Sequence, residues 1–434
     1  MKKHFLIILF SVFVIESYSQ AINDSIAIVQ LLEKEALSWR TGDLKTHSDC
    51  WQVKPYNRIW VTSNNGNSIN VPPARIINPS LENVGKGGLA FLSNFKMNIF
   101  NQNAWVSHDE VSVDLEGKET HSREFRLLEK EGSKWKLVGQ SMYIYNLREN
   151  NTDTISYLNV VDITTNRIET VYKTNKHIEA PNWHADNYLI VNSYGRLYTF
   201  DLKTKKYTVI NTGSVNAVNN DHGISPDNKW IVVSNNENHG TTIETYNSTI
   251  RILPVTGGES RKITSELMSF WHGWSPDGKT LAFTGFRNND MDIYTIGIDG
   301  GAETRLTNSL GLDDGPDYSK DGRYIYYNSY KTGHMQIWRM LADGSNQEQL
   351  TFDDHSNWFA HPSPDNKWIV YIAYMNDEKQ AHLFGKQVKL RLMNVETKEI
   401  SDLTPTFFGG QGTINVPSWS PDSKKIAFVS YSIK

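Results

Sequence analysis

The second half of the chain alternates short apolar strands with one recurring polar turn. In its clearest copy, Ser275-Pro-Asp-Gly278 is followed by apolar and polar positions that alternate from Leu281 to Thr284. Proline sets φ at the second turn position and glycine tolerates a positive φ, so the sequence is typical of a tight turn between strands. Copies begin at 184, 225, 275, 319, 363 and 420, the first with histidine in place of serine. Their spacing of 41 to 57 residues predicts four strands per repeat.

The last copy leaves no room for its third and fourth strands after Ile433. Strand-like patterns at Ser156–Asp162 and Arg167–Tyr172 precede the first copy and supply the missing pair. Joining strands from both ends would remove exposed sheet edges. We therefore predict that residues 155–434 form an all-β six-bladed propeller closed by N- and C-terminal strands.

A different pattern fills residues 22–148, which contain no such turn. Apolar residues recur at three- and four-residue spacings from Ile26 to Leu37, which predicts a helix. Strand-like runs follow between Arg58 and Tyr143, and the last two are joined by a glycine-containing hairpin loop at Glu129–Ser133. A helix followed by a strand meander predicts an α+β cone. The polar stretch 149–154 is the expected linker between the two domains.

The N-terminus has the features of a secretory signal peptide. Lys2 and Lys3 precede an apolar run from Phe5 to Ile15, and Ser17 and Ser19 suit a cleavage site. The alternative, a membrane anchor, is disfavoured because the run is too short to span a bilayer. We expect residues 1–19 to be removed and the protein to be exported, periplasmic or secreted, with no membrane span after cleavage. Net charge is −4, which does not favour nucleic-acid binding.

Both domains resemble known families. The helix ending at Ser38–Asp43, the strand Ala104–Glu110 and the hairpin Arg126–Val138 resemble the SnoaL-like branch of the nuclear transport factor 2-like superfamily. That resemblance implies a conical pocket and a homodimer, with His108, Asp109, His121 and Glu124 as the acid/base candidates. The repeats resemble the TolB-like six-bladed propellers, exported bacterial proteins often labelled biopolymer transporters.

In such propellers the first strand of each repeat lines the central channel, so residues before the turn gather at its mouth. His222 and His272 both lie three residues before the turn serine, and His361 is displaced by one position. Histidine and carboxylate clusters suit a transition metal or acid–base catalysis. We predict His222, His272 and His361 as ligands of one divalent metal ion, and His222, His272 and Asp314 as catalytic residues. The pattern is similar in kind to oligogalacturonate lyases, which hold a metal with axial histidines.

Neighbouring loops supply further candidates at the same mouth. Asp221, His382 and Gln411 lie on loops beside it, Arg287 offers a cation, and Trp358 and Phe408 offer aromatic faces that stack on sugar rings. We predict Arg287, Trp358, Phe408 and Gln411 as ligand-binding residues. Two functions remain open. One is a saccharide lyase or hydrolase assisted by a metal. The other is a non-catalytic periplasmic binding or scaffold protein of TolB type that engages a protein, peptide or glycan partner.

Overall fold

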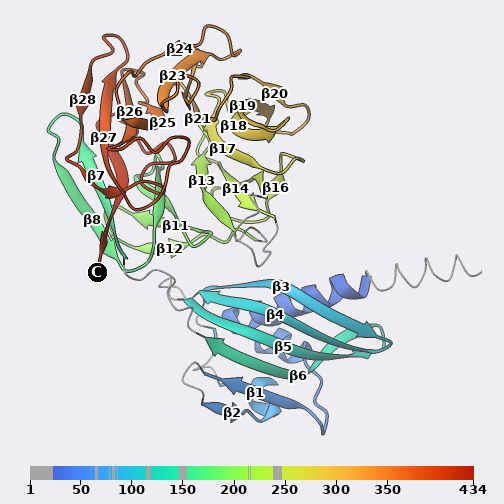
Figure 1. The fold of residues 1–434 in the computed structure, drawn as a ribbon. Helices are drawn as coiled ribbons and strands as arrows, with labels where there is room; N and C mark the ends of the chain where they lie inside the picture. Colours follow the sequence, from blue (N-terminus) through green and yellow to red (C-terminus); the bar gives the residue numbers. More distant parts are fainter. Residues whose placement is uncertain are drawn as a thin grey trace, which may run out of the picture. The chain divides into compact units, whose positions relative to one another are not determined.

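The computed structural model describes residues 23–63, 67–77, 79–80, 84–85, 87–113, 119–145, 154–213, 215, 217–237 and 247–434 (Figure 1). The predicted signal peptide at 1–19 and linker positions 149–153 lie outside the described residues. The chain divides into two compact units, Met1–Asn150 and Asn151–Lys434. Within the described part, no helix has the length and apolar character needed to cross a membrane.

Unit 1 pairs a helical run at 23–41 with one six-stranded sheet. The sheet order is β2-β1-β6-β5-β4-β3, and β1 runs parallel to β6. The buried face of the sheet, including Val106 and Leu137, packs against Ile28 and Leu32 of the helical run. The elements are α2 (Leu44–Asp49), α3 (Pro73–Ile77), β1 (Arg58–Thr62), β2 (Ser68–Asn70), β3 (Leu89–Phe100), β4 (Asn103–Val113), β5 (Glu119–Glu131) and β6 (Lys134–Tyr145).

The described part of unit 2 contains six small sheets, arranged in the manner of a propeller (Figure 1). Five hold four strands in antiparallel order, with β29 added to the fifth. The strands are β9 (Glu179–Trp183), β10 (Tyr188–Ser193), β11 (Arg196–Asp201) and β12 (Tyr207–Val209); β13 (Val218–Ile224), β14 (Trp230–Asn236), β15 (Ser248–Pro254) and β16 (Arg261–Lys262); β17 (Ser269–Trp274), β18 (Thr280–Arg287), β19 (Asp290–Gly297) and β20 (Thr304–Arg305); β21 (Asp313–Tyr318), β22 (Tyr324–Ser329), β23 (Gln336–Leu341) and β24 (Glu348–Gln349); and β25 (Ser356–Pro362), β26 (Trp368–Tyr374), β27 (Lys386–Asn394), β28 (Ile400–Asp402) and β29 (Phe407–Gly409).

The sixth sheet joins the two ends of unit 2. It contains β30 (Lys425–Ile433), β7 (Thr154–Asp162) and β8 (Ile168–Thr174), and β30 pairs with β7 from Lys425 opposite Asp162 to Ile433 opposite Thr154. The first strand expected in this repeat is reduced to a bridge between Trp419 and Ile426. Pro417 does not explain the difference, because Pro181 and Pro316 occupy the same repeat position inside the complete strands β9 and β21.

Each sheet packs on the next through buried apolar side chains. The clusters span successive pairs of sheets and also join the sixth sheet to the first. Residues that share a cluster across each boundary are Ile190 with Ile231, Val232 with Phe283, Ala282 with Ile325, Tyr326 with Ile369, Val370 with Phe428, and Leu158 with Leu189.

The recurring turn is closed by its serine. Ser275 Oγ donates to Asp277 Oδ1 at 2.6 Å and accepts from Thr280 N at 2.9 Å, while Gly278 N donates to Ser275 O at 2.9 Å. Gly278 has φ +69, and asparagine at 228 and 366 takes a similar positive φ in other copies. The Ser-Pro-Asp pattern therefore marks strand connections, as predicted.

Candidate active site

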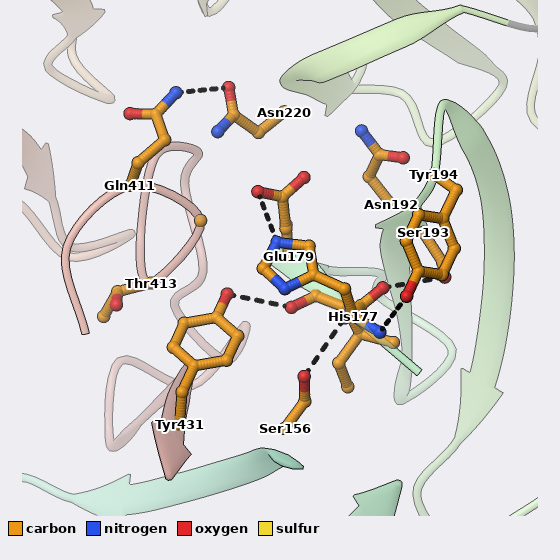
Figure 2. Close-up of polar contacts among 12 residues, drawn as sticks. Ser156, His177, Glu179, Asn192, Ser193, Tyr194, Asn220, Gln411, Thr413 and Tyr431 are labelled. Atoms are coloured by element: carbon orange, nitrogen blue, oxygen red, sulfur yellow. Dashed lines mark hydrogen bonds and ion pairs between the residues drawn. The ribbon is translucent and has the colours of Figure 1, made fainter. Parts of the chain in front are cut away.

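Polar side chains from five sheets meet beside the first strands of unit 2. We call this group the inner cluster. Glu179 begins β9, Asn220 and Asp221 lie in β13, His272 lies in β17, Asp314 lies in β21, His382 lies between β26 and β27, and Gln411 follows β29. Hydrogen bonds and ion pairs connect most members, and Figure 2 shows the part around Glu179, Asn220 and Gln411.

An ion pair between His272 and Asp314 forms the buried end of the cluster. His272 Nε2 lies 3.2 Å from Asp314 Oδ1, which also accepts from Thr284 Oγ1 at 2.7 Å and from Gly315 N at 2.7 Å. Burial opposes ionisation of Asp314, but the His272 imidazolium outweighs it and lowers the pKa of Asp314 to about 2. Burial likewise disfavours the imidazolium, yet Asp221 and Asp314 raise the pKa of His272 above its usual value.

His272 retains an unused donor. Its Nδ1 has no hydrogen-bond partner, although the residue is only 3% exposed. A buried polar group without a partner costs free energy, so such groups are rare. This nitrogen is therefore the strongest local indication that the cluster accepts a ligand group.

Asp221 differs from Asp314 because no cation binds it directly. Burial raises the pKa of Asp221 to about 7, and the negative charges of Asp314 and Glu179 add to this effect, while His272 opposes it. Asp314 is therefore ionised, and Asp221 is half-protonated near neutral pH. Neighbouring titratable groups with separated pKa values are typical of acid–base sites.

His382 connects the ion pair to two amides. Its Nδ1 donates to Gln411 Oε1, and Gln411 Nε2 donates to Asn220 Oδ1 at 2.9 Å (Figure 2 shows the second bond). His382 Nε2 lies 3.7 Å from Asp314 Oδ2. Burial lowers the pKa of His382, which favours the neutral imidazole. Its ring packs edge-on against Trp358 with 4.7 Å between centroids.

Glu179 and His177 form the more open end of the cluster. His177 Nε2 lies 3.0 Å from Glu179 Oε1, and the His177 ring stacks on Tyr431 (Figure 2). A Cβ on Gly412 would lie 2.8 Å from Glu179 Oε1 and 2.7 Å from the Tyr431 hydroxyl. Gly412 also has φ +89, so only glycine fits beside this carboxylate.

The three histidines predicted as metal ligands have separate partners. His361 uses both ring nitrogens, with Nδ1 3.1 Å from Asp317 Oδ2 and Nε2 2.9 Å from Ile414 O. His222 is fully buried, its Nε2 lies 3.4 Å from Ile190 O, and burial lowers its pKa to about 4. Across the described ranges, no three His, Cys, Asp or Glu side chains are arranged to hold a metal ion. The predicted ligand set His222, His272 and His361 therefore does not fit a metal, and we derive no step through one.

The predicted ligand-binding residues have mixed positions. Arg287 makes two 2.9 Å contacts with Glu303 and also bonds Ser269, so its charge is already engaged. Trp358 is fully buried behind His382, and Phe408 packs edge-on against Phe384. Of these four, only Gln411 belongs to the inner cluster. His272 and Asp314 are brought together as predicted.

Sequence reasoning missed His177, Glu179 and Asn220, and named Asp221 and His382 only as neighbours. Some members of the inner cluster could have been found from their common position in the repeat. Glu179, Asn220, Asp314 and Asn415 all lie five residues before a turn serine or its histidine equivalent. The prediction was based on the histidines at the third position before the serine and did not consider the fifth position.

A separate cavity opens on the side of the Ser-Pro-Asp turns. Its volume is about 380 Å³, and it lies among the indoles of Trp183, Trp274 and Trp419. The prolines that follow four of the turn serines complete much of its wall; they are Pro226, Pro276, Pro364 and Pro421. We call it the turn-side cavity.

The similarity to known proteins lies in the propeller part of the chain. Residues 241–415 match the family model of the TolB beta propeller domain. An uncharacterized protein of Agrobacterium fabrum is 43% identical over 278 residues, which are 64% of this chain and 92% of that protein. The chain belongs to the TolB-type β-propeller family. The predicted TolB likeness is thereby confirmed, whereas the SnoaL-like assignment of unit 1 stays a prediction.

Solved structures agree with the family. The structure of a putative TolB from Agrobacterium tumefaciens is 42% identical, covers 64% of this chain and 99% of its own, and has a TM-score of 0.60. TolB from Acinetobacter baumannii is 16% identical over 74% of this chain and 81% of its own, with a TM-score of 0.46. A shared propeller fold does not fix the function, which depends on the chemistry of the site.

Proposed function

We propose that this protein is an exported TolB-type propeller that binds a saccharide at the inner cluster and cleaves it by acid–base catalysis. One observation carries the proposal: Asp314 and Asp221 lie in the same cluster with pKa values near 2 and near 7. Glycosidic-bond cleavage requires a protonated acid beside an unprotonated base, and a carboxyl with a pKa near 7 can supply the acid at neutral pH.

Roles follow from the protonation states. Asp221 can hold a proton near neutral pH and give it to the leaving glycosidic oxygen. A water molecule attacks the anomeric carbon as the glycosidic bond breaks, and the neutral His382 takes its proton, since burial lowers the pKa of His382 and Gln411 fixes its ring through Nδ1. Asp314 stays ionised and keeps His272 charged, so that the free Nδ1–H of His272 can donate to an oxygen of the bound sugar.

The architecture supports one site that is built from residues of several sheets. We propose that the six sheets close into a six-bladed ring, because β30 pairs with β7 and because apolar clusters join each sheet to the next, the sixth to the first included. In such a ring the first strands surround one axis, which would bring residues from several sheets to one point.

A non-catalytic function is the second candidate. The turn-side cavity favours it, because indole faces and proline rings suit a peptide or glycan that is held without being cleaved. This function would place binding away from the inner cluster.

Turnover of a saccharide panel by the mature protein tests the first proposal. New reducing ends should appear with one sugar class, and Asp221→Asn should lower the rate at least 100-fold in a protein that stays folded and is no less stable than the wild type. The exposed Glu396→Gln is the matched control and should keep the wild-type rate. Cleavage that survives Asp221→Asn would contradict the catalytic role, as would a protein that neither binds nor cleaves any saccharide.

A further inference from the structure

We infer that the inner cluster selects a ligand that carries a protonated primary amine and rejects uronates and other anionic sugars. The inference rests on the proposed function, since it names the chemical class that the same site would accept. It is based on the charged side chains of the cluster. Some of them are already neutralised by ion pairs, and others can still bind a ligand.

Carboxyl groups outnumber the fixed cations of the cluster. Glu179, Asp221 and Asp314 contribute three carboxyls, and among the described residues none of them forms an ion pair with lysine or arginine. The charged groups acting most strongly on Asp221 are His272, Asp314 and Glu179. Those acting most strongly on Asp314 are His272 and His382. Only imidazoles balance the acids.

Arginine is the side chain best suited to bind a uronate carboxylate, because it offers two parallel N–H donors. The arginine predicted for this mouth is Arg287, and Glu303 already occupies its guanidinium on two sides. A carboxylate-bearing sugar would therefore meet like charges and no free guanidinium. Like charges in a desolvated site disfavour binding.

Glu179 is the carboxylate with spare capacity. Among the described residues its ion-pair partner is His177, which contacts Oε1, whereas Asp314 accepts three hydrogen bonds or ion pairs through Oδ1. The Glu179 side chain is 17% exposed and that of His177 is 24% exposed, against 3% for His272. An ammonium group that enters the cluster would reach Glu179 first, because the Glu179 side chain is more exposed than those of His272 and Asp314 (Figure 2 shows Glu179).

The unpaired His272 Nδ1 provides an independent indication of a ligand. It is deeply buried and lacks an acceptor, so the ligand should carry an oxygen as well as an amine. An amino sugar has both groups, and so does the amino end of a peptide. The chemistry common to the two is a primary ammonium with a neighbouring oxygen acceptor.

Calorimetric titration of the mature protein distinguishes these sources. The probes are the β-1,4-linked disaccharide of glucosamine, its N-acetylated form, a galacturonate disaccharide, alanyl-alanine and N-acetyl-alanyl-alanine. At least one free amine should bind 10-fold or more tightly than its acetylated form, and galacturonate should bind more weakly than either sugar. A preference shown only by the sugars identifies an amino sugar, and one shown only by the peptides identifies an amino terminus.

Variants of Glu179 test whether this residue causes the preference for a free amine. Glu179→Gln should abolish the difference between amine and acetylated probe, while Glu179→Asp, which keeps the charge, and the remote Glu396→Gln should retain it. Equal or tighter binding of galacturonate or of the acetylated probes would overturn the inference and leave the proposed saccharide site standing. If none of the five probes and no other saccharide binds, the proposed function fails and the inference fails with it.

Discussion

At the scale of single residues, burial at Asp221 has a stability cost that depends on pH. Its pKa is about 7 in the folded protein and about 3.9 in an unfolded chain. The folded state therefore binds more protons between these values, and stability falls as pH rises through that window. Below about pH 4 both states carry a neutral Asp221, and the cost disappears.

Replacing Asp221 by asparagine removes this cost. Asp221→Asn should raise the unfolding midpoint by several degrees at pH 8 and leave it nearly unchanged at pH 4, as measured by differential scanning calorimetry. Asp299→Asn, at a side chain that is 93% exposed, is the matched control and should shift neither midpoint. An equal shift at both pH values would show that the carboxyl of Asp221 does not titrate as described.

Sequence reasoning found His272, Asp314 and Gln411 because the repeat places them near one mouth of the propeller. It could not assign partners. His361 lies 44 residues from Asp317 and 53 residues from Ile414, and its contact with both depends on side-chain geometry across sheets. Its position resembled that of His272, but its nitrogens are used inside the protein. The same limit hides the ion pair between Arg287 and Glu303, which the sequence does not show.

At the scale of elements, glycine allows the first strands to approach one another. A Cβ on Gly273 of β17 would lie 2.7 Å from Pro316 O and 3.1 Å from Asp317 Cα, both on β21. Backbone atoms of a neighbouring strand cannot move aside as a flexible side chain can. Close contact between β17 and β21 is therefore incompatible with a larger residue at this position.

The substitution Gly273→Ala should lower the free energy of unfolding by about 1–3 kcal/mol, as overpacking in a dense core does. Gly297→Ala is the control, since its Cβ would lie 3.5 Å from Gly300 O and its φ is not positive. Chemical denaturation of the two variants gives the comparison. Equal stabilities would mean that β17 and β21 are not packed as closely as the structure has them.

Strand positions were predictable because alternation and turn chemistry agree at each repeat. The alternating positions from Leu281 to Thr284 lie in β18 at Thr280–Arg287, and the predicted terminal pair corresponds to β7 and β8. The exception is the repeat that starts at 420, where a full first strand was expected. Only the bridge at Trp419 forms there, although Pro417 occupies the position that Pro181 and Pro316 hold inside β9 and β21.

At the scale of the whole molecule, unit 1 presents an apolar sheet face to solvent. Trp60, Trp105, Phe125, Leu127 and Tyr143 are each between 39% and 49% exposed. Strand register makes them neighbours, since Trp105 lies opposite Leu127 and its ring stacks on Phe125. A patch of this kind marks an interaction surface. Arg123 and Asp109 at its edge carry both signs of charge, which suits association with a second copy.

We therefore expect the chain without the predicted signal peptide, residues 1–19, to be a dimer by light scattering. Combining Phe125→Asp with Leu127→Asp should give the monomer mass, whereas Phe352→Asp, at an equally apolar exposed site in unit 2, should leave the dimer intact. A wild-type protein that is monomeric at micromolar concentration would contradict this expectation.

Binding by variants of the two sites tests the central claim most directly. Calorimetric titration with the sugar or peptide that the mature protein binds best should give one site per chain. His272→Gln should weaken that binding at least 10-fold, and Trp183→Ala in the turn-side cavity should leave it unchanged. The opposite result, with affinity lost in Trp183→Ala and kept in His272→Gln, would move the function to the turn-side cavity and contradict the account.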